Sequence, residues 1–258
     1  MSGTRAGGPP RLTREAPGRA TITLDRAQHL NRLHREDLLA LQAHIAELAA
    51  DASLRVVVLT GRGRFFCAGF NLQELDEPSA ATADPQLFEH TVDALEALPV
   101  PTIARLNGGV FGGATDLALA CDFRIGVEGM ELRMPAARLG LHYYPSGMGR
   151  YVSRLGLAAA KRLFLLAETV PAEALLALGY LDALVAPDGL DAAVEQIAHS
   201  LLQGAPLALR GMKQSLNDIA RGEHTALAAR VQACAGSADL REGLAAWAAR
   251  RSPRFEGR

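Results

Sequence analysis

The sequence predicts an α/β fold, with helices packed around a parallel sheet and a helical part at the C-terminal end. Three observations support this prediction. Strand patterns alternate with segments of helical spacing up to Met134. A strand pattern at Thr102–Leu106 runs into a helix through several glycines. Beyond Tyr151 nearly every segment has a helical pattern, with a Pro or Gly at most junctions.

The first elements predicted are a strand, a helix and a second strand. Residues 20–25 (ATITLD) alternate as a half-buried strand does, and residues 54–60 (LRVVVLT) form an apolar run typical of a strand covered on both faces. Between them, apolar residues recur at helical spacing at Leu38, Leu41, Ile45 and Leu48. Residues 1–18 are rich in Gly, Pro and Arg, have little to bury, and are expected to form a mobile tail.

The following elements continue the alternation. A loop at 61–75 (GRGRFFCAGFNLQEL) precedes a helix with apolar positions at Leu87, Val92, Leu95 and Leu98. Further strand patterns occur at 121–128, 131–134 and 180–186, and residues 135–150 are irregular. We therefore divide the chain into a tail at 1–18, a β/α core at 19–190 and a helical C-terminal region at 191–258.

The stretch at 101–122 (PTIARLNGGVFGGATDLALACD) joins a strand to a helix at Ala114–Ala120 through glycines. The first backbone N–H groups of a helix have no partner within it, and the helix dipole adds positive potential there. Glycines, which lack a Cβ, let a ligand approach the backbone closely. The turn therefore predicts a site for an anion or an oxyanion, and the alternative is a tight turn without a ligand.

The composition limits the classes of function. The chain has 258 residues, 49% of them hydrophobic, and a formal net charge of −1, which gives no electrostatic footprint for nucleic acid or an anionic membrane. Its three cysteines, Cys67, Cys121 and Cys234, have no spacing that indicates a disulfide framework or a zinc site. Without an apolar stretch for a membrane span or a signal peptide, a cytoplasmic protein with no metal is expected.

Several segments occur together in one order, and they resemble the crotonase superfamily, the enoyl-CoA hydratase/isomerase family. These segments are ITLDRAQHLNRL, RVVVLTGRGRFFCAGFNLQEL, LNGGVFGGATDLALACDFRI, MPAARLGL and DLREGLAAWAARRSPRF, and they extend over roughly residues 20–257. The resemblance implies a crotonase-like spiral of ββα units with a helical C-terminal trimerisation region. It also implies a homotrimer or a dimer of trimers.

The resemblance further implies a substrate and a catalytic device. Members of this family bind a coenzyme A thioester with its carbonyl oxygen between two backbone N–H groups, which stabilise an enolate. By position these would be the N–H groups of Ala68 and Gly113. Coenzyme A would be part of the substrate, with no tightly bound cofactor. The implied contacts to it are Gln28, His29, Leu30, Ala68, Gly69, Phe70, Asn71 and Gly113.

The acid and base residues depart from the family pattern. Hydratases of this family use two glutamates, and the corresponding positions here hold Asp116 and Ala136. Alanine cannot transfer a proton, so hydration by two glutamates is doubtful. Asp116 is either catalytic or a favourable charge at a helix N-terminus. His142 and Tyr143 are the candidate replacements, with Tyr144 a weaker one, and the alternative for each is a wall of the acyl pocket.

Three functions remain open from the sequence. The first is an enzyme that acts on acyl-CoA thioesters by hydration, double-bond isomerisation or decarboxylation. The second is a degenerate member that binds acyl-CoA without turnover, and the third is a hydrolase with water activated by His142 or Asp116. Arg210 and Lys213 are expected on a solvated helix face, with coenzyme A phosphates as alternative ligands. Buried packing roles are expected for Cys67, Met130, Met134 and Trp247.

Overall fold

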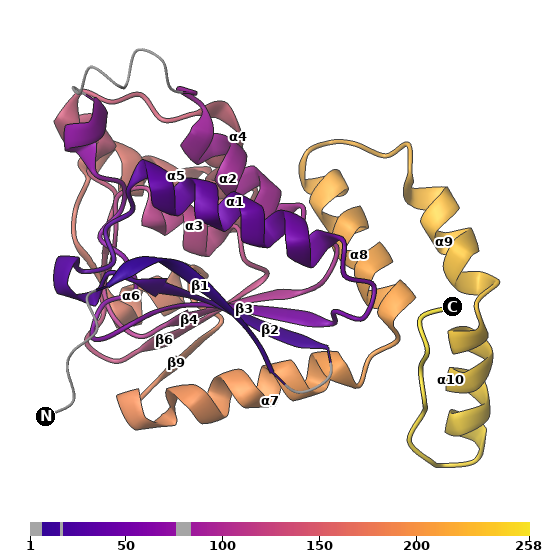
Figure 1. Cartoon of the computed structure of the whole chain (residues 1–258). Helices are drawn as coiled ribbons and strands as arrows, with labels where there is room; N and C mark the ends of the chain where they lie inside the picture. Colours follow the sequence, from indigo (N-terminus) through magenta and orange to yellow (C-terminus); the bar gives the residue numbers. More distant parts are fainter. Residues whose placement is uncertain (1–6, 16–17, 76–83) are drawn as a thin grey trace, which may run out of the picture.

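The computed structural model describes residues 7–15, 18–75 and 84–258. Its main sheet has the strand order β1-β2-β3-β4-β6-β9 (Figure 1). These strands are β1 (Gly8–Arg14), β2 (Arg19–Asp25), β3 (Val56–Gly61), β4 (Thr102–Leu106), β6 (Phe123–Val127) and β9 (Ala183–Val185). Only β1 is antiparallel to its neighbour, whereas the later pairs are parallel. A parallel sheet with helices around it is therefore the observed architecture, as the sequence predicts.

A second, smaller sheet lies beside the glycine turn. Its strands are β5 (Val110–Phe111), β7 (Glu131–Arg133) and β8 (Val170–Pro171), in that order. The β5 strand pairs in parallel with β7, and β7 pairs antiparallel with β8. Because β5 immediately precedes the second pair of glycines, this sheet fixes the direction in which the chain enters the next helix.

Helices cover both faces of the main sheet (Figure 1). On one side lie α1 (Arg35–Ala49), α2 (Leu87–Glu96), α3 (Ala114–Leu119), α4 (Pro145–Leu155) and α5 (Leu157–Lys161), and on the other lies α7 (Leu190–Leu202). A short α6 (Ala172–Ala177) precedes β9. The predicted helix positions Leu38, Leu41, Ile45 and Leu48 are all buried in α1. Residues Val56–Leu59 of β3 are buried in succession, as expected for a strand covered on both faces.

The prediction of a mobile tail is wrong for residues 8–14. They form β1, whose register pairs Arg11 with Thr23 and Arg14 with Ala20. Two prolines hide the strand pattern, but an edge strand tolerates proline because one side of its backbone has no ladder to complete. Residues 1–6 and 16–17 lie outside the described residues, and so does the polar stretch at 76–83.

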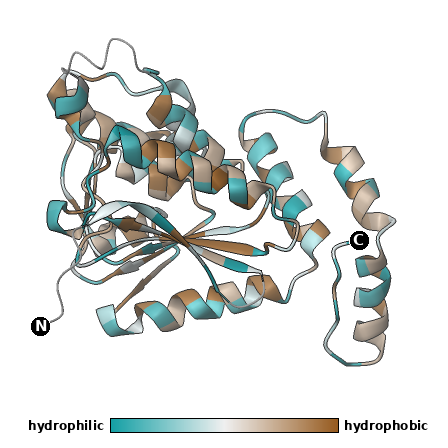
Figure 2. Ribbon diagram, viewed as in Figure 1, coloured by the Kyte–Doolittle hydropathy of each residue, from teal (hydrophilic) through white to brown (hydrophobic). Residues whose placement is uncertain are grey.

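The C-terminal part consists of α8 (Pro206–Ala220), α9 (Leu227–Ala235) and α10 (Ala238–Ala248). In Figure 1, α9 and α10 lie beside the body of the molecule rather than over the sheet. Figure 2 shows hydrophobic positions on these helices, and the large exposed ones are Met212, Leu216, Ile219, Val231, Leu240, Leu244 and Trp247. The prediction that Trp247 packs inside the chain is wrong, because this residue is 86% exposed in the single chain. Met130 and Met134 are buried as predicted.

No helix in the described part of the chain is long and apolar enough to cross a membrane.

Candidate oxyanion and proton-transfer site

The loop at 67–71 is held by the segment at 30–34. The Leu33 N–H donates to the Gly69 carbonyl at 2.8 Å, and the Asn71 N–H donates to the Leu33 carbonyl at 2.8 Å. Leu30 adopts a positive φ of 53°, which turns the chain so that its carbonyl also faces this loop. That carbonyl accepts the Ala68 N–H at 2.9 Å. The loop is thus fixed by main-chain bonds on both sides of Gly69.

These bonds leave one N–H of the loop free. The Ala68 N–H already has an acceptor in Leu30, which argues against its predicted role as a free donor to a substrate oxygen. Within the described ranges, the N–H of Phe70 has no hydrogen-bond acceptor, and neither has the N–H of Gly113. Among the described residues, the N–H of this loop without an acceptor is therefore that of Phe70, two residues after the predicted Ala68.

Gly69 brings this loop against the glycine turn. Its φ is 89°, a conformation that favours glycine. A Cβ at this position would lie 2.7 Å from the Phe111 carbonyl oxygen and 3.3 Å from the Gly113 nitrogen. An isolated bridge between Cys67 and Val110 joins the same two segments. The Gly113 N–H at the start of α3 consequently lies beside the loop that holds the Phe70 N–H.

The ring of Phe88 lies at the centre of the predicted site residues. A Cβ on Gly113 would be 2.5 Å from this ring, so any other residue here requires the ring to move. The Phe88 ring also packs against Phe70, with centroids 6.3 Å apart, and against Tyr144, with centroids 6.2 Å apart. Gly113, Phe70 and Tyr144 therefore meet around one aromatic side chain, which the sequence pattern did not single out.

Asp116 lies one turn after Gly113 on α3 and is fully buried. Its Oδ2 accepts hydrogen bonds from Tyr144 Oη at 2.5 Å and from Arg150 Nη1 at 2.7 Å. Its Oδ1 is buried and has no partner in the described part of the chain. Burial raises the pKa of Asp116 above its ordinary value, although the charge of Arg150 favours the ionised form.

Two tyrosine rings extend from Asp116 toward the rest of the site. Tyr143 and Tyr144 are stacked, with centroids 4.2 Å apart, and Tyr143 Oη donates to Tyr144 Oη at 3.1 Å. Burial raises the pKa of Tyr143 and of Tyr144, and the negative charge of Asp116 adds to both shifts. Both hydroxyls accordingly keep their protons near neutral pH. Asp116, Tyr144 and Tyr143 form one hydrogen-bonded chain.

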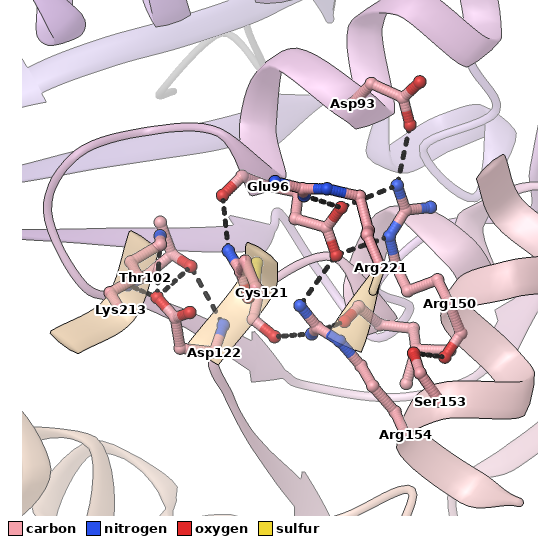
Figure 3. Close-up of polar contacts among 12 residues, drawn as sticks. Asp93, Glu96, Thr102, Cys121, Asp122, Arg150, Ser153, Arg154, Lys213 and Arg221 are labelled. Atoms are coloured by element: carbon pink, nitrogen blue, oxygen red, sulfur yellow. Dashed lines mark hydrogen bonds and ion pairs between the residues drawn. The ribbon is translucent and has the colours of Figure 1, made fainter. Parts of the chain in front are cut away.

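Arg150, which the sequence analysis missed, links this chain to α2. Its Nε donates to Glu96 at 3.0 Å and its Nη2 to Asp93 at 2.7 Å, as Figure 3 shows. Burial alone would lower the pKa of Arg150, but the carboxylates of Asp116 and Glu96 raise it, so the guanidinium stays charged. No sequence spacing reveals this partner, because Asp93, Asp116 and Arg150 come from three separate helices.

The remaining predicted residues lie in different surroundings. His142 is exposed, and its Nδ1 lies 2.8 Å from the Tyr143 carbonyl oxygen, outside the chain of hydroxyls. Gln28 and His29 are exposed in a single 3₁₀ turn (Ala27–His29), with Leu30 directly after it. Ala136 is buried at the start of another 3₁₀ turn (Ala136–Leu139).

Three other expectations concern a thiol and two cations. Cys67 is buried as expected, and burial raises the pKa of its thiol to about 12, which makes it a poor nucleophile. Lys213 is not on a solvated face, because its buried ammonium lies 2.8 Å from Asp122 and donates to the Val100 carbonyl. Arg210 Nη2 donates to the Leu54 carbonyl at 2.8 Å.

Among the described residues, no group of three His, Cys, Asp or Glu side chains is arranged to hold a metal ion.

Comparison with known proteins covers almost the whole chain. The model of the enoyl-CoA hydratase/isomerase family matches residues 15–258. An enoyl-CoA isomerase/hydratase of Mycosarcoma maydis, fer4, is 31% identical over 96% of each chain. The 2,3-dehydroadipyl-CoA hydratase of Escherichia coli is 31% identical over 92% of this chain and 94% of its own.

Solved structures agree with these sequence relatives. The crystal structure of an enoyl-CoA hydratase from Bacillus anthracis superimposes with a TM-score of 0.88 at 30% identity, over 97% of this chain and 100% of that one. The agreement includes the sheet, the glycine turn and the C-terminal helices, since so little of either chain lies outside it. From its sequence and its fold, the chain belongs to the enoyl-CoA hydratase/isomerase family of the crotonase superfamily.

Proposed function

We propose that this enzyme forms an enolate from an acyl-CoA thioester and stabilises it with the N–H groups of Phe70 and Gly113. The observation that supports this assignment is the pair of backbone donors without acceptors on two adjoining segments, one of them at a helix N-terminus. Such fixed donors favour the charge that develops on a thioester oxygen, and each typically lowers the barrier by about 3 kcal/mol. Coenzyme A enters as part of the substrate.

The reaction that fits these residues best is proton transfer at the α-carbon, as in double-bond isomerisation. Hydration by two carboxylates needs a second acid, and the position that would supply it is Ala136. The first carboxylate, Asp116, is fully buried and bonded to Arg150 and Tyr144. A single carboxylate with two hydroxyls favours moving one proton rather than adding water across a double bond.

Decarboxylation of a malonyl-type thioester is the second candidate. Loss of carbon dioxide leaves the same enolate, which the same two donors would stabilise, and it needs no base at the α-carbon. The absence of a second carboxylate at Ala136 favours this candidate, and the hydroxyl of the half-buried residue Tyr143 would then interact with the substrate carboxylate.

The binding of coenzyme A and the assembly are also proposals. The exposed turn with Gln28 and His29 adjoins Leu30, whose carbonyl accepts a hydrogen bond from the loop at 67–71. The coenzyme A part of a thioester bound at that loop would therefore extend over this turn. The exposed apolar residues of α8, α9 and α10 are a suitable face for another copy of the chain. We propose a homotrimer or a dimer of trimers that is formed through this face.

Incubation with 2-enoyl-, 3-enoyl- and malonyl-type CoA thioesters in heavy water, followed by mass spectrometry, tests the function. Conversion of a 3-enoyl into a 2-enoyl thioester with deuterium uptake supports isomerisation, and carbon dioxide loss supports the second candidate. Gain of water would contradict the exclusion of hydration, and free coenzyme A would indicate a hydrolase. Thioesters that bind and are recovered unchanged, without deuterium, would identify a binding protein instead.

A further inference from the structure

We propose that Asp116 is the terminal proton acceptor of a relay through the hydroxyls of Tyr144 and Tyr143. The inference rests on the proposed function and deepens it, because it names the groups that take up the α-proton. Asp116 has no exposed surface, so no substrate touches its carboxylate directly. Its only polar connections among the described residues are the Tyr144 hydroxyl and the Arg150 guanidinium. The Tyr144 ring packs on Phe88, the same ring that lies against Phe70 and Gly113.

The direction of the hydrogen bonds supports a path into the protein. Tyr143 Oη donates to Tyr144 Oη, and Tyr144 Oη donates to Asp116 Oδ2 at 2.5 Å. A hydroxyl that donates a hydrogen bond to one neighbour can still accept a hydrogen bond or a proton at its oxygen lone pairs. Tyr143 is the member of this hydrogen-bonded chain farthest from Asp116, and its side chain, like that of Tyr144, is only half-buried. Its oxygen is arranged to accept a proton, while its own proton already points toward Asp116.

The step balances as a concerted shift of three protons. The α-proton passes to Tyr143 Oη, the Tyr143 proton passes to Tyr144 Oη, and the Tyr144 proton passes to Asp116 Oδ2. The electron pair of the broken C–H bond becomes the enolate, and the negative charge moves from Asp116 to the thioester oxygen. There the N–H groups of Phe70 and Gly113 stabilise it. The reverse shift returns a proton to the carbon skeleton and restores the carboxylate.

The surroundings of Asp116 suit an acceptor that holds a proton only briefly. Burial raises the pKa of its carboxyl, which increases its affinity for a proton, while the charge of Arg150 favours the ionised form. Arg150 is itself fixed by Asp93 and Glu96 of α2, so it positions the carboxylate and does not exchange protons. The other titratable groups nearby are the buried hydroxyls of Tyr151 and Tyr180. Both are bonded to Thr115 and lie outside the relay.

Tyr144→Phe interrupts the relay and keeps the ring that packs on Tyr143 and Phe88. Deuterium exchange is measured with the thioester of the panel above that the wild type turns over. We expect Tyr144→Phe to lower the rate about 100-fold, the usual lower value for positioned proton transfer. Tyr180→Phe is the matched control, because it also removes a buried hydroxyl that donates to α3, at 2.7 Å to the Thr115 carbonyl, and it should keep the rate.

The pH profile gives a readout that a structural role would not change. The wild-type rate should fall as the pH drops through the pKa of Asp116, above the ordinary aspartate range. In Asp116→Asn this acidic limb should disappear together with most of the rate. Wild-type exchange in Tyr144→Phe, or an unchanged acidic limb in Asp116→Asn, overturns the relay and leaves the proposed function standing. No exchange in the wild type with any thioester overturns both.

Discussion

Gly113 is required by the space around it and not by its backbone conformation. Its φ of −59° suits any residue, yet a Cβ would lie 2.5 Å from the Phe88 ring. The ring would have to move, and with it the contacts to Phe70 and Tyr144. A single methyl group at this position thus disturbs the donors and the tyrosines at once.

We predict that Gly113→Ala lowers kcat/KM about 100-fold, because the added methyl group displaces Phe88 and shifts the retained N–H out of position. Losing the effect of one preorganised oxyanion donor changes the rate by this order. Steady-state turnover of the best thioester of the panel measures it. Gly149→Ala is the matched control: Gly149 lies within α4, and a Cβ there would have no atom within 4 Å. This control should keep its activity and gain roughly 0.5–1 kcal/mol of unfolding free energy. Normal turnover in Gly113→Ala would contradict the claim that the space beside Phe88 requires glycine at this position.

The residue scale also shows what the sequence can and cannot predict. The glycine turn was predicted from its residues alone, because glycine at a strand-to-helix junction has a local physical meaning. The loop at 67–71 was predicted from the resemblance to the family. Which N–H of the loop is free depends on the Leu30 carbonyl, which lies outside the motif. The partner of Asp116 was missed for the same reason, since Arg150 approaches from another helix.

At the scale of elements, the start of α1 holds the segment that follows the loop at 67–71. Glu74 Oε2 accepts the Arg35 N–H at 2.9 Å, and Glu74 Oε1 lies 2.5 Å from His34 Nδ1. Asn71 Nδ2 donates to the same Oε1 at 3.3 Å. Burial alone would raise the pKa of Glu74, but these hydrogen bonds lower it below its ordinary value.

We predict that Glu74→Gln lowers the unfolding free energy by about 1–3 kcal/mol at neutral pH, since it removes charge-assisted hydrogen bonds. The folded pKa is the lower one, so the stabilisation is complete above the unfolded value of about 4.3 and is lost as the pH falls through the folded value. Urea unfolding at several pH values measures the difference, which should shrink in acid. The exposed neighbour Gln73 supplies the control, Gln73→Ala. A difference that is independent of pH would contradict this explanation.

Elements were predicted best where the pattern reflects burial. The α1 positions and the β3 run are such cases, because the hydrophobic effect acts on each residue in turn. The β1 strand failed as a prediction, since its stability comes from its pairing with β2 and not from a core of its own. Edge strands of this kind depend on the neighbour more than on their own side chains.

At the scale of the whole molecule, ion pairs and a hydrogen bond connect α8 and the residue after it to the rest of the chain. Lys213 interacts with Asp122, and Arg221 lies 3.8 Å from Glu96 (Figure 3). Asn217 donates to the Glu96 carbonyl. The same Glu96 carboxylate accepts a hydrogen bond from Arg150. The C-terminal helices are therefore connected to the carboxylate of the relay through two side chains.

We predict that Trp247→Glu converts an oligomer into smaller species, because it places a charge in the exposed apolar face of α8–α10. Light scattering coupled to size-exclusion chromatography measures the mass. Leu39→Glu is a suitable control, since Leu39 is 54% exposed on α1 and is not part of these helices. If Trp247→Glu and the wild type have the same mass, the face is not the contact between copies.

The positive φ of Gly69 restricts how this enzyme can evolve. Only glycine lacks a Cβ, and a Cβ at this position would be strained by the positive φ and would meet the Phe111 carbonyl. Any substitution of Gly69 therefore disrupts the loop. The next residue, Phe70, is less restricted in its side chain. If Phe70 acts through its N–H, its side chain can change without the loss of the donor, and selection can alter the acyl pocket there while the enolate chemistry is inherited unchanged.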